Sequence, residues 1–200
     1  MLTVVCVNFN NYLGRGIEYV GKLGRALDRN LKRKHRRVCI TDANEASSFD
    51  IEPAEEGKLG WWQKLTCFRP GLFTGRVMYI DLDSVITGSL DELADTKGIV
   101  DLHDWGWKTH TLGSGVMVWD GGEHANAYER YHNQTVPMLH RGDQDWLTSL
   151  GGWSILPANW LRSYRYHCKD GIPKGCKIVA MHGKPKPHEI THGWVPDFWR

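Results

Sequence analysis

The sequence has no long hydrophobic run and no strong excess of charge of either sign. Its 200 residues contain no stretch of 18 apolar residues, which excludes a membrane-spanning helix. The formal net charge is only +2, so charge alone predicts neither a nucleic acid nor a membrane partner. The first residues, MLTVVCVNFN, lack the basic lead and the long apolar core of a secretory signal. We therefore expect a cytoplasmic protein.

Cysteine is also scarce, and the cysteines that occur follow no recognisable pattern. There are five, an odd number, and no C-x-x-C motif occurs. Two lie in strand-like apolar runs, VVCV and RVCI, where a thiol acts as a small apolar side chain. This usage favours a reducing compartment over a disulfide framework. A zinc site made of His167, Cys168, Cys176 and His182 stays an alternative, although the spacing fits no common zinc motif.

The order of apolar segments predicts an α/β fold. An apolar run over 3–9 indicates a strand buried on both faces, the apolar spacing over 17–31 indicates a helix, and 36–42 reads as a second strand. Such a β-α-β unit implies a parallel sheet. Further helices are expected over 124–139 and from residue 143 onward. There is no internal repeat and no linker, so we expect one domain over residues 1–200.

Two features have both a structural and a functional interpretation. The basic run at 32–37, KRKHRR, fits the solvated end of a helix, and a phosphate- or DNA-binding patch is the alternative. Ten tryptophans favour a cleft with large flat walls, although many of them will belong to the core. The tail after residue 183 is rich in Pro, His and Trp and is expected to form an ordered strap rather than a helix.

The strongest local feature is a carboxylate pair at the end of a predicted strand. The segment VMYIDLD places Asp81 and Asp83 two residues apart, so both side chains leave the sheet on the same side. Ligands bind at the carboxyl ends of strands in parallel α/β sheets. Two adjacent carboxylates repel each other unless a cation lies between them, and Mg²⁺ or Mn²⁺ carrying a diphosphate suits such ligands. The alternative is a solvated turn in which Asp83 caps the following segment.

A second polar cluster, HGKPKPH, follows the predicted strand KIVAM. His182 is delivered by that strand, and Gly183 lets the backbone approach a ligand closely. Lys184 and Lys186 flank it and would offset phosphate charge beside a metal-bound imidazole. The alternative is an ordinary basic turn.

The two clusters in this order resemble the glycosyltransferases of the GT-A fold, most closely glycosyltransferase family 8, the group that includes glycogenin. The segments that carry the resemblance are VNFNNYLGRGIEYVGKLGRAL, WWQKLTCF, YIDLDSVITGSLDEL, LGSGVMVWD, GDQDWLTSL, LPANW and HGKPKPH. They span most of the chain. The resemblance implies one GT-A, Rossmann-like domain with a mostly parallel central sheet flanked by helices. It also implies a hexosyltransferase that uses a nucleotide-sugar donor.

The same resemblance implies a ligand set for the metal and the diphosphate. Asp81, Asp83 and His182 would hold Mn²⁺ or Mg²⁺, with Asp81 also near the ribose. Lys184 would touch the diphosphate of a UDP-sugar, with Lys186 as a helper.

Further donor contacts follow from the resemblance, residue by residue. The other residues implied to bind the nucleotide sugar are Asn8, Tyr12, Lys64, Ser114 and Gly115. The pair implied beside the reacting sugar is Asp143 and Gln144. Some of these residues have a structural alternative: Tyr12 as a loop anchor, Lys64 as an exposed helix lysine, and the final pair as helix caps.

Two departures from the family pattern bear on the substrate. Gly113 stands where the family has an asparagine that contacts the donor sugar, so the identity of the sugar is open. The final motif is compressed, which leaves the roles of Lys184 and Lys186 open. The chain also lacks long acceptor-side insertions.

We expect a metal-dependent retaining glycosyltransferase that moves a sugar from a UDP-sugar to an acceptor hydroxyl, with a saccharide as acceptor. Gln144 is an amide and cannot act as a general base, which fits a front-face path in which the leaving phosphate takes the acceptor's proton. One alternative is the same chemistry on a hydroxymethylated DNA base, as some phages need. Another is a non-catalytic sugar- or nucleic-acid-binding module.

Overall fold

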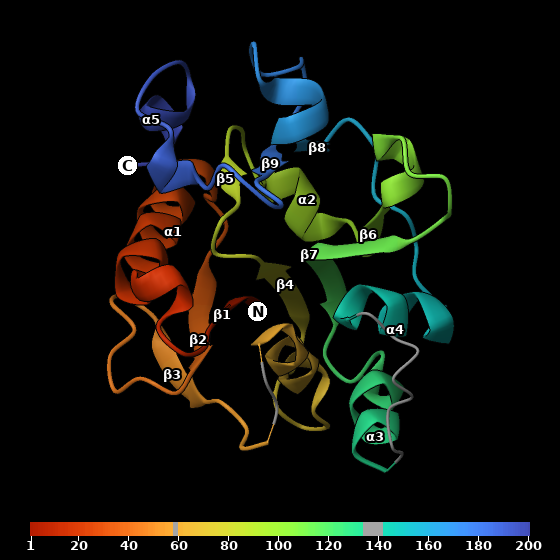
Figure 1. Cartoon of the computed structure of the whole chain (residues 1–200). Coiled ribbons are helices and arrows are strands. Elements are labelled where there is room, and N and C mark those ends of the chain that lie inside the picture. The colour runs from red at the N-terminus through yellow and green to blue at the C-terminus, as the bar shows by residue number, and fades with distance from the viewer. Residues whose placement is uncertain (58–59, 134–141) are drawn as a thin grey trace.

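The computed structural model describes residues 1–57, 60–133 and 142–200, which form two β-sheets with helices packed around them (Figure 1). The larger sheet has the strand order β3-β2-β1-β4-β7-β6, and the smaller has the order β5-β9-β8. The strands of the larger sheet are β1 (Leu2–Asn8), β2 (His35–Thr41), β3 (Asp50–Pro53), β4 (Arg76–Ile80), β6 (Gly98–Asp101) and β7 (Leu112–Asp120). Those of the smaller sheet are β5 (Val85–Ile86), β8 (Leu161–Ser163) and β9 (Ile178–Ala180).

The first three strands confirm the expected parallel α/β start of the chain. Strand β1 pairs in parallel with β2 and with β4, and β2 pairs in parallel with β3. Helix α1 (Gly16–Asn30) connects β1 to β2, as the sequence predicts. Val4 and Val5 point to opposite faces of β1 and both are fully buried, which explains why this strand is continuously apolar.

The other half of the larger sheet is antiparallel. Strand β7 pairs antiparallel with both β4 and β6, so β6 runs in the same direction as β4. Only β7 runs against the other strands of this sheet, which is therefore mostly parallel, as expected. The chain builds outward from β1 to β2 and β3 and then returns to place β4 on the other side of β1. The boundary between β1 and β4 is therefore the topological switch point, where the carboxyl ends of parallel strands leave a crevice for ligands.

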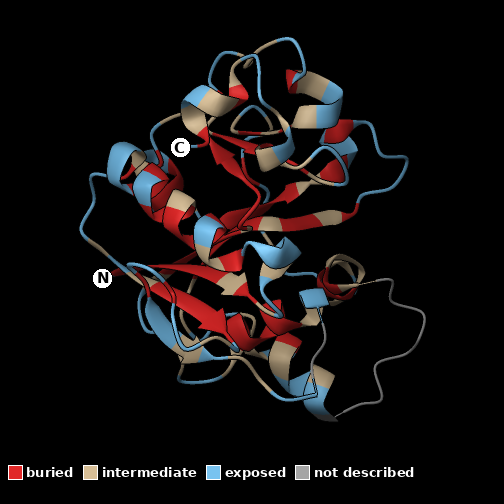
Figure 2. Ribbon diagram, turned by 60° about the vertical axis from the view of Figure 1, so that its left-hand side comes forward, coloured by how far each residue is buried: buried red, intermediate tan, exposed pale blue. Residues whose placement is uncertain are grey.

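Helices and loops cover both faces of the larger sheet, and its strands β1, β4 and β7 are largely buried, whereas the edge strand β3 is mostly exposed (Figure 2). One hydrophobic cluster joins β1, α1 and α2 (Asp91–Asp95) to the smaller sheet. A second cluster, on the opposite face, packs β1 and β4 against the 3₁₀ helix η2 (Gly60–Phe68) and helix α4 (Asp143–Leu150). Because the first cluster continues into the smaller sheet, the two sheets share one core.

The predicted helices after β7 are found, with two differences. Helix α3 spans Ala125–Asn133, and the part of the expectation over 134–139 lies outside the described residues. Helix α4 begins at Asp143, as expected, but that aspartate does not cap it. The N-cap is Gly142, without a side-chain hydrogen bond, because the Asp143 carboxylate instead meets Ser114 and Lys64 beneath the site.

The tail forms the expected strap, although it contains two short helical turns, η5 (Pro187–Glu189) and α5 (Val195–Phe198). It runs beside α1, where Arg29 donates a hydrogen bond of 2.9 Å to the carbonyl oxygen of Phe198. The ring of Trp199 lies edge-on to Tyr19, with centroids 4.9 Å apart. These contacts fix the strap to the outside of α1 (Figure 1).

None of the helices in the described residues has the length and apolarity needed to span a membrane. All five cysteines are free and buried, in agreement with the expectation of no disulfide framework.

Candidate active site

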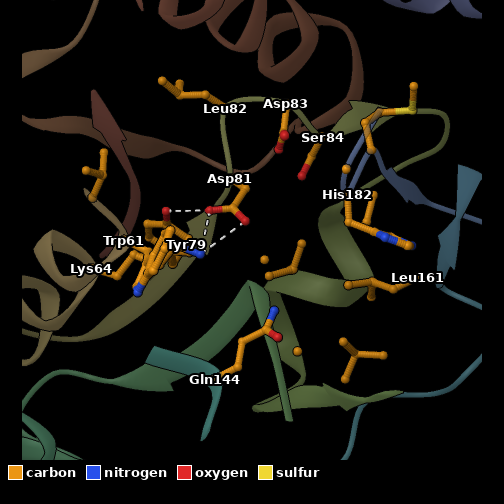
Figure 3. A pocket seen from close by; sticks show the side chains of 18 of the residues that line it. Trp61, Lys64, Tyr79, Asp81, Leu82, Asp83, Ser84, Gln144, Leu161 and His182 are labelled. Carbon is orange, nitrogen blue, oxygen red and sulfur yellow. Dashed lines mark hydrogen bonds and ion pairs between the residues drawn. The ribbon is translucent and has the colours of Figure 1, made fainter. Parts of the chain in front are cut away.

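The main cavity of the described residues has a volume of about 520 Å³ and opens at the carboxyl ends of β1 and β4 (Figure 3). Its walls come from both halves of the larger sheet, from η2, from α4 and from the segment after β9. The carboxylates lie on one side of the cavity in Figure 3, and Gln144 projects toward its middle from the opposite side.

The two aspartates after β4 each contact a lysine. Nζ of Lys64 lies 2.9 Å from Oδ1 and 3.2 Å from Oδ2 of Asp81. Lys186, from the segment after β9, donates a hydrogen bond to Asp83. The hydroxyl of Tyr12 donates to the same carboxylate at 2.8 Å. The predicted carboxylate pair is therefore at the cavity, and each member is neutralised by a cation of the protein.

Lys64 lies in a buried network between η2, β4, β7 and α4. Its ammonium group is 3.4 Å from a carboxylate oxygen of Asp143 and donates to Oγ of Ser114 at 3.2 Å. Burial disfavours the charged ammonium, but the carboxylates of Asp143 and Asp81 outweigh this effect and raise the pKa of Lys64. Burial also raises the pKa of Asp81, against the lowering influence of Lys64. A fixed positive charge therefore lies directly beneath the cavity.

Two glycines shape the side chains around this charge. A Cβ at Gly115 would lie 3.2 Å from Oδ2 of Asp81, so the missing side chain leaves room for that carboxylate. A Cβ at Gly16 would lie 1.9 Å from Oδ1 of Asn8. Asn8 is thus enclosed under the start of α1, where the same oxygen accepts a hydrogen bond of 3.1 Å from the backbone N–H of Tyr12.

His182 lies on the far side of the cavity and bonds to a buried serine. Its Nε2 is 2.6 Å from Oγ of Ser163, at the end of β8, and its ring stacks on Trp105 with centroids 5.8 Å apart. Burial lowers the pKa of His182, and Arg165 and Lys186 lower it further. The imidazole is therefore neutral near pH 7, as a metal ligand must be.

The donor set of this cavity fits a divalent cation in its chemistry, because two carboxylates and a neutral imidazole face one space. The side chains do not yet meet: the described residues contain no cluster of three or more His, Cys, Asp or Glu side chains placed to hold a metal. Asp81 and Asp83 contact lysines, and His182 contacts Ser163.

Most of the predicted site residues come together, and the rest lie just outside. Those that line the cavity are Tyr12, Lys64, Asp81, Asp83, Gly115, Gln144, His182 and Lys186. Those that do not line it are Asn8, Ser114, Asp143 and Lys184. The first three of these are buried and support their neighbours, whereas Lys184 is exposed on the strap.

Four aromatic residues of the cavity are absent from the sequence-based prediction: Phe9, Trp61, Tyr79 and Trp105. Tyr79 donates a hydrogen bond of 2.7 Å to Oδ1 of Asp81. A signal for it exists, since it precedes Asp81 by two residues and shares that face of the strand. The two tryptophans have no such local signal, because their place depends on how η2 and the segment after β6 fold onto the sheet.

The two alternative polar sites differ from the cavity. Cys168 and Cys176 interact with each other, whereas His167 and His182 both bond to Ser163, so these four residues do not converge on one point. The basic run at 32–37 lies at the amino end of β2, opposite the edge that carries the cavity. All three of its arginines form ion pairs, with Asp95, Asp50 and Asp28.

The fold and the position of the cavity together define the class of structure: a Rossmann-like α/β fold of the kind seen in glycosyltransferases. Solved structures with this fold include an active-site mutant of LgtC in which a glutamine is replaced by glutamate, with a TM-score of 0.71 and 12% identity over 98% of this chain and 93% of that one. GlyE of Streptococcus pneumoniae TIGR4 has a TM-score of 0.70 and 16% identity over 98% of this chain and 58% of its own. The bifunctional glycosyltransferase WbbM has a TM-score of 0.63 and 14% identity over 93% of this chain and 46% of its own. No protein-family model and no curated protein sequence matches the chain.

Proposed function

We propose that the protein is a metal-dependent retaining glycosyltransferase that moves a sugar from a UDP-sugar to a hydroxyl group of a saccharide. The observation that carries the proposal is the meeting of Asp81, Asp83, Lys186 and Gln144 at one cavity on the switch point of the sheet. The fold shared with LgtC supports it, and one LgtC structure holds donor and acceptor sugar analogues.

The nucleotide belongs at the β1 end of the cavity. Phe9 and Tyr12 supply aromatic surface there for a base, and they lie next to the carboxylates that follow β4. Lys186 reaches the cavity from the strap and offers its ammonium group to a diphosphate. The same lysine pairs with Asp83 and so balances the negative charge of that carboxylate.

Asp81, Asp83 and His182 are the residues that would hold the divalent cation, and its chemistry when bound is to offset the charge of a departing diphosphate. An imidazole in the ligand set favours Mn²⁺ over Mg²⁺. Lys64 lies beneath the same point, where its ion pairs with Asp81 and Asp143 keep it protonated and hold the Asp81 carboxylate in place.

The carboxylates of the cavity favour retention over inversion. An inverting enzyme needs a carboxylate base that is free to activate the acceptor. Among the described residues that line the cavity, the carboxylates are Asp81 and Asp83, and both form ion pairs with lysines. Gln144 projects toward the reaction centre but cannot take a proton. The leaving diphosphate is therefore the acceptor for the proton of the attacking hydroxyl. LgtC also has an active-site glutamine, the residue replaced in its mutant structure.

The structure does not favour modified DNA as the acceptor. The basic run at 32–37 lies at the opposite edge of the sheet from the cavity, and its arginines are neutralised by aspartates. A duplex held there would not present a base to the carboxylates after β4.

The test is release of UDP from a panel of UDP-sugars with Mn²⁺, first by slow hydrolysis and then with saccharide acceptors. We expect turnover with Mn²⁺, none in excess EDTA, and at least a hundredfold loss in Asp83→Asn, with the fold intact by circular dichroism. Asp170→Asn, an exposed aspartate of a distant loop, is the matched control and keeps full activity.

Two results would reject the proposal. Full turnover in EDTA would show that the reaction does not depend on a divalent metal. Metal and UDP binding without any UDP-sugar turnover would point instead to a non-catalytic binding module.

A further inference from the structure

The cavity is elongated across the strands of the larger sheet. If the proposed function holds, each end of it would meet a different part of the donor. Its lining crosses the sheet in strand order, from the β1 end (Phe9 and Tyr12), past β4 (Asp81 and Asp83), to β7 and β6. With the nucleoside at the switch point and the diphosphate at the carboxylates, the sugar of the donor lies over β7 and β6. This end of the cavity therefore meets the sugar.

The wall at this sugar end is apolar. Its side chains, which we call the apolar wall, are Val100, Leu102, Trp105, Val116 and Leu161. They come from β6, the segment that follows it, β7 and β8, and all belong to the same hydrophobic cluster. The indole N–H of Trp105, the one hydrogen-bond donor among these side chains, is used within the protein and bonds to the carbonyl oxygen of Leu161 at 3.2 Å. The wall therefore offers carbon surface and no free side-chain hydrogen-bonding group.

Gly113 completes this wall, and a side chain at this position would force its apolar neighbours to move. A Cβ at Gly113 would lie 2.6 Å from Cγ1 of Val100 and 2.7 Å from Cδ2 of Leu102, closer than carbon atoms approach. The apolar wall is packed directly behind the backbone at this position. With glycine at residue 113, the chain offers no amide side chain at this position to bind a sugar hydroxyl.

The polar groups close to the wall are few and mostly engaged. Ser114 is fully buried and bonds to Lys64 and Asp143, and Nε2 of His182 bonds to Ser163. Gln144 and the hydroxyl of Ser84 remain as uncharged polar side chains at the cavity (Figure 3). A plain hexose has several hydroxyls, and each one buried against carbon without a partner loses its hydrogen bonds to water at a cost. A methyl group in the same place gains from burial.

We propose that the donor sugar carries a methyl-bearing substituent, an acetamido group or a 6-deoxy carbon, which packs on the apolar wall. This inference rests on the proposed function and narrows its donor. The wall selects the sugar because burying a methyl group against it is favourable, whereas a hydroxyl group buried there has no hydrogen-bond partner. Gln144 is then free to bind the remaining hydroxyls.

The test compares donors that share a ring configuration and differ only in this group: UDP-N-acetylglucosamine, UDP-6-deoxyglucose and UDP-glucose, with the galactose series alongside. Calorimetry gives the affinity, and release of UDP with Mn²⁺ gives the turnover. We expect at least one methyl-bearing donor to bind or react tenfold better than its plain hexose, which corresponds to about 1.4 kcal/mol. The two donor types show which substituent is used.

A pair of variants links that preference to the wall. Val100→Thr keeps the shape but places a hydroxyl on the wall, and it is expected to lower the preference at least threefold. Val118→Thr is the matched control, because Val118 is fully buried in the same cluster but does not line the cavity. Val118→Thr should leave the donor preference unchanged, even if it lowers stability as much as Val100→Thr does.

The outcomes separate this inference from the proposed function. Equal or better use of UDP-glucose and UDP-galactose overturns the role of the wall and leaves a glycosyltransferase in place. Absence of binding and turnover for every UDP-sugar overturns the proposed function, and this inference with it. A preference that survives Val100→Thr unchanged also overturns the inference, because the selection then arises elsewhere.

Discussion

At the scale of single residues, the cavity neutralises its own charges before any ligand enters. Asp81 contacts Lys64, and Asp83 contacts Lys186 and Tyr12. One of these lysines is buried in a fixed network, and the other reaches in from the strap. The fixed lysine is held by Asp81 and Asp143, whereas under the proposed function the strap lysine would exchange its carboxylate for a diphosphate.

Gln144 gives the first prediction at this scale. Gln144→Ala removes an uncharged side chain that orients the reacting sugar, so kcat should fall by about 30- to 100-fold, or about 2–3 kcal/mol, with little change in UDP-sugar affinity. Turnover and calorimetry on the same variant measure the two effects. Ser149→Ala, on the exposed side of the same helix, is the control. A large loss of affinity with unchanged kcat would assign Gln144 to the nucleotide instead.

His124 gives a second prediction, which concerns stability and pH. This residue has a positive φ of 58° before α3, and its ring stacks on Trp153 at 3.8 Å. Burial lowers the pKa of His124 below its ordinary value of 6.5, so protonation opposes folding. Its contribution to stability is complete above pH 6.5 and is lost as the pH falls through the pKa of the folded state.

We therefore expect the free energy of unfolding to fall between pH 7 and pH 5 by more in the wild type than in His124→Asn. Asparagine tolerates the positive φ and does not titrate. Urea unfolding at several pH values measures this difference, and His192→Asn, at an exposed position of the strap, is the control. Identical pH dependence in wild type and His124→Asn would show that protonation of His124 does not destabilise the folded state.

At the scale of elements, Lys64 connects the 3₁₀ helix η2 to β4, β7 and α4. Its partners come from each of these elements: Asp81 follows β4, Ser114 lies in β7 and Asp143 begins α4. The lysine therefore holds the floor of the cavity together as well as charging it. Removing it leaves two carboxylates without their cation in a buried place.

Lys64→Met should lower the free energy of unfolding by about 3 kcal/mol, because breaking a buried ion pair on one side leaves an uncompensated charge. Adding Asp143→Asn should restore part of the loss. Lys97→Met, which breaks exposed ion pairs with Asp120 and Glu123, should change stability little. Urea unfolding measures all three. Equal effects of the buried and the exposed lysine would contradict the network.

The elements also show how far sequence reasoning reaches. The parallel strands, α1 and the carboxylate pair were predictable, because apolar runs, helical spacing and the two-residue period of a strand are local signals. The orientation of His182 was not, because its partner Ser163 belongs to β8 and meets it across the smaller sheet. The packing of Val100 behind Gly113 was not either, because it depends on a register shift between β6 and β7.

At the scale of the whole molecule, the two halves of the larger sheet divide the work. The parallel half forms the switch point, where we propose that the nucleotide binds, and the antiparallel half supplies the apolar wall that we propose for the sugar. The strap leaves β9, brings Lys186 to the carboxylates and then continues along α1 (Figure 1). The basic run lies at the other edge of the sheet and takes no part in the site.

The central claim is that this cavity binds a metal and a UDP-sugar. A crystal structure with Mn²⁺ and UDP, with anomalous data at the manganese edge, tests it most directly. The account predicts an anomalous peak ligated by Asp81, Asp83 and His182, with the diphosphate next to Lys186 and the uracil beside Tyr12. A manganese peak or a UDP molecule bound outside this cavity, with the cavity itself empty, would contradict it.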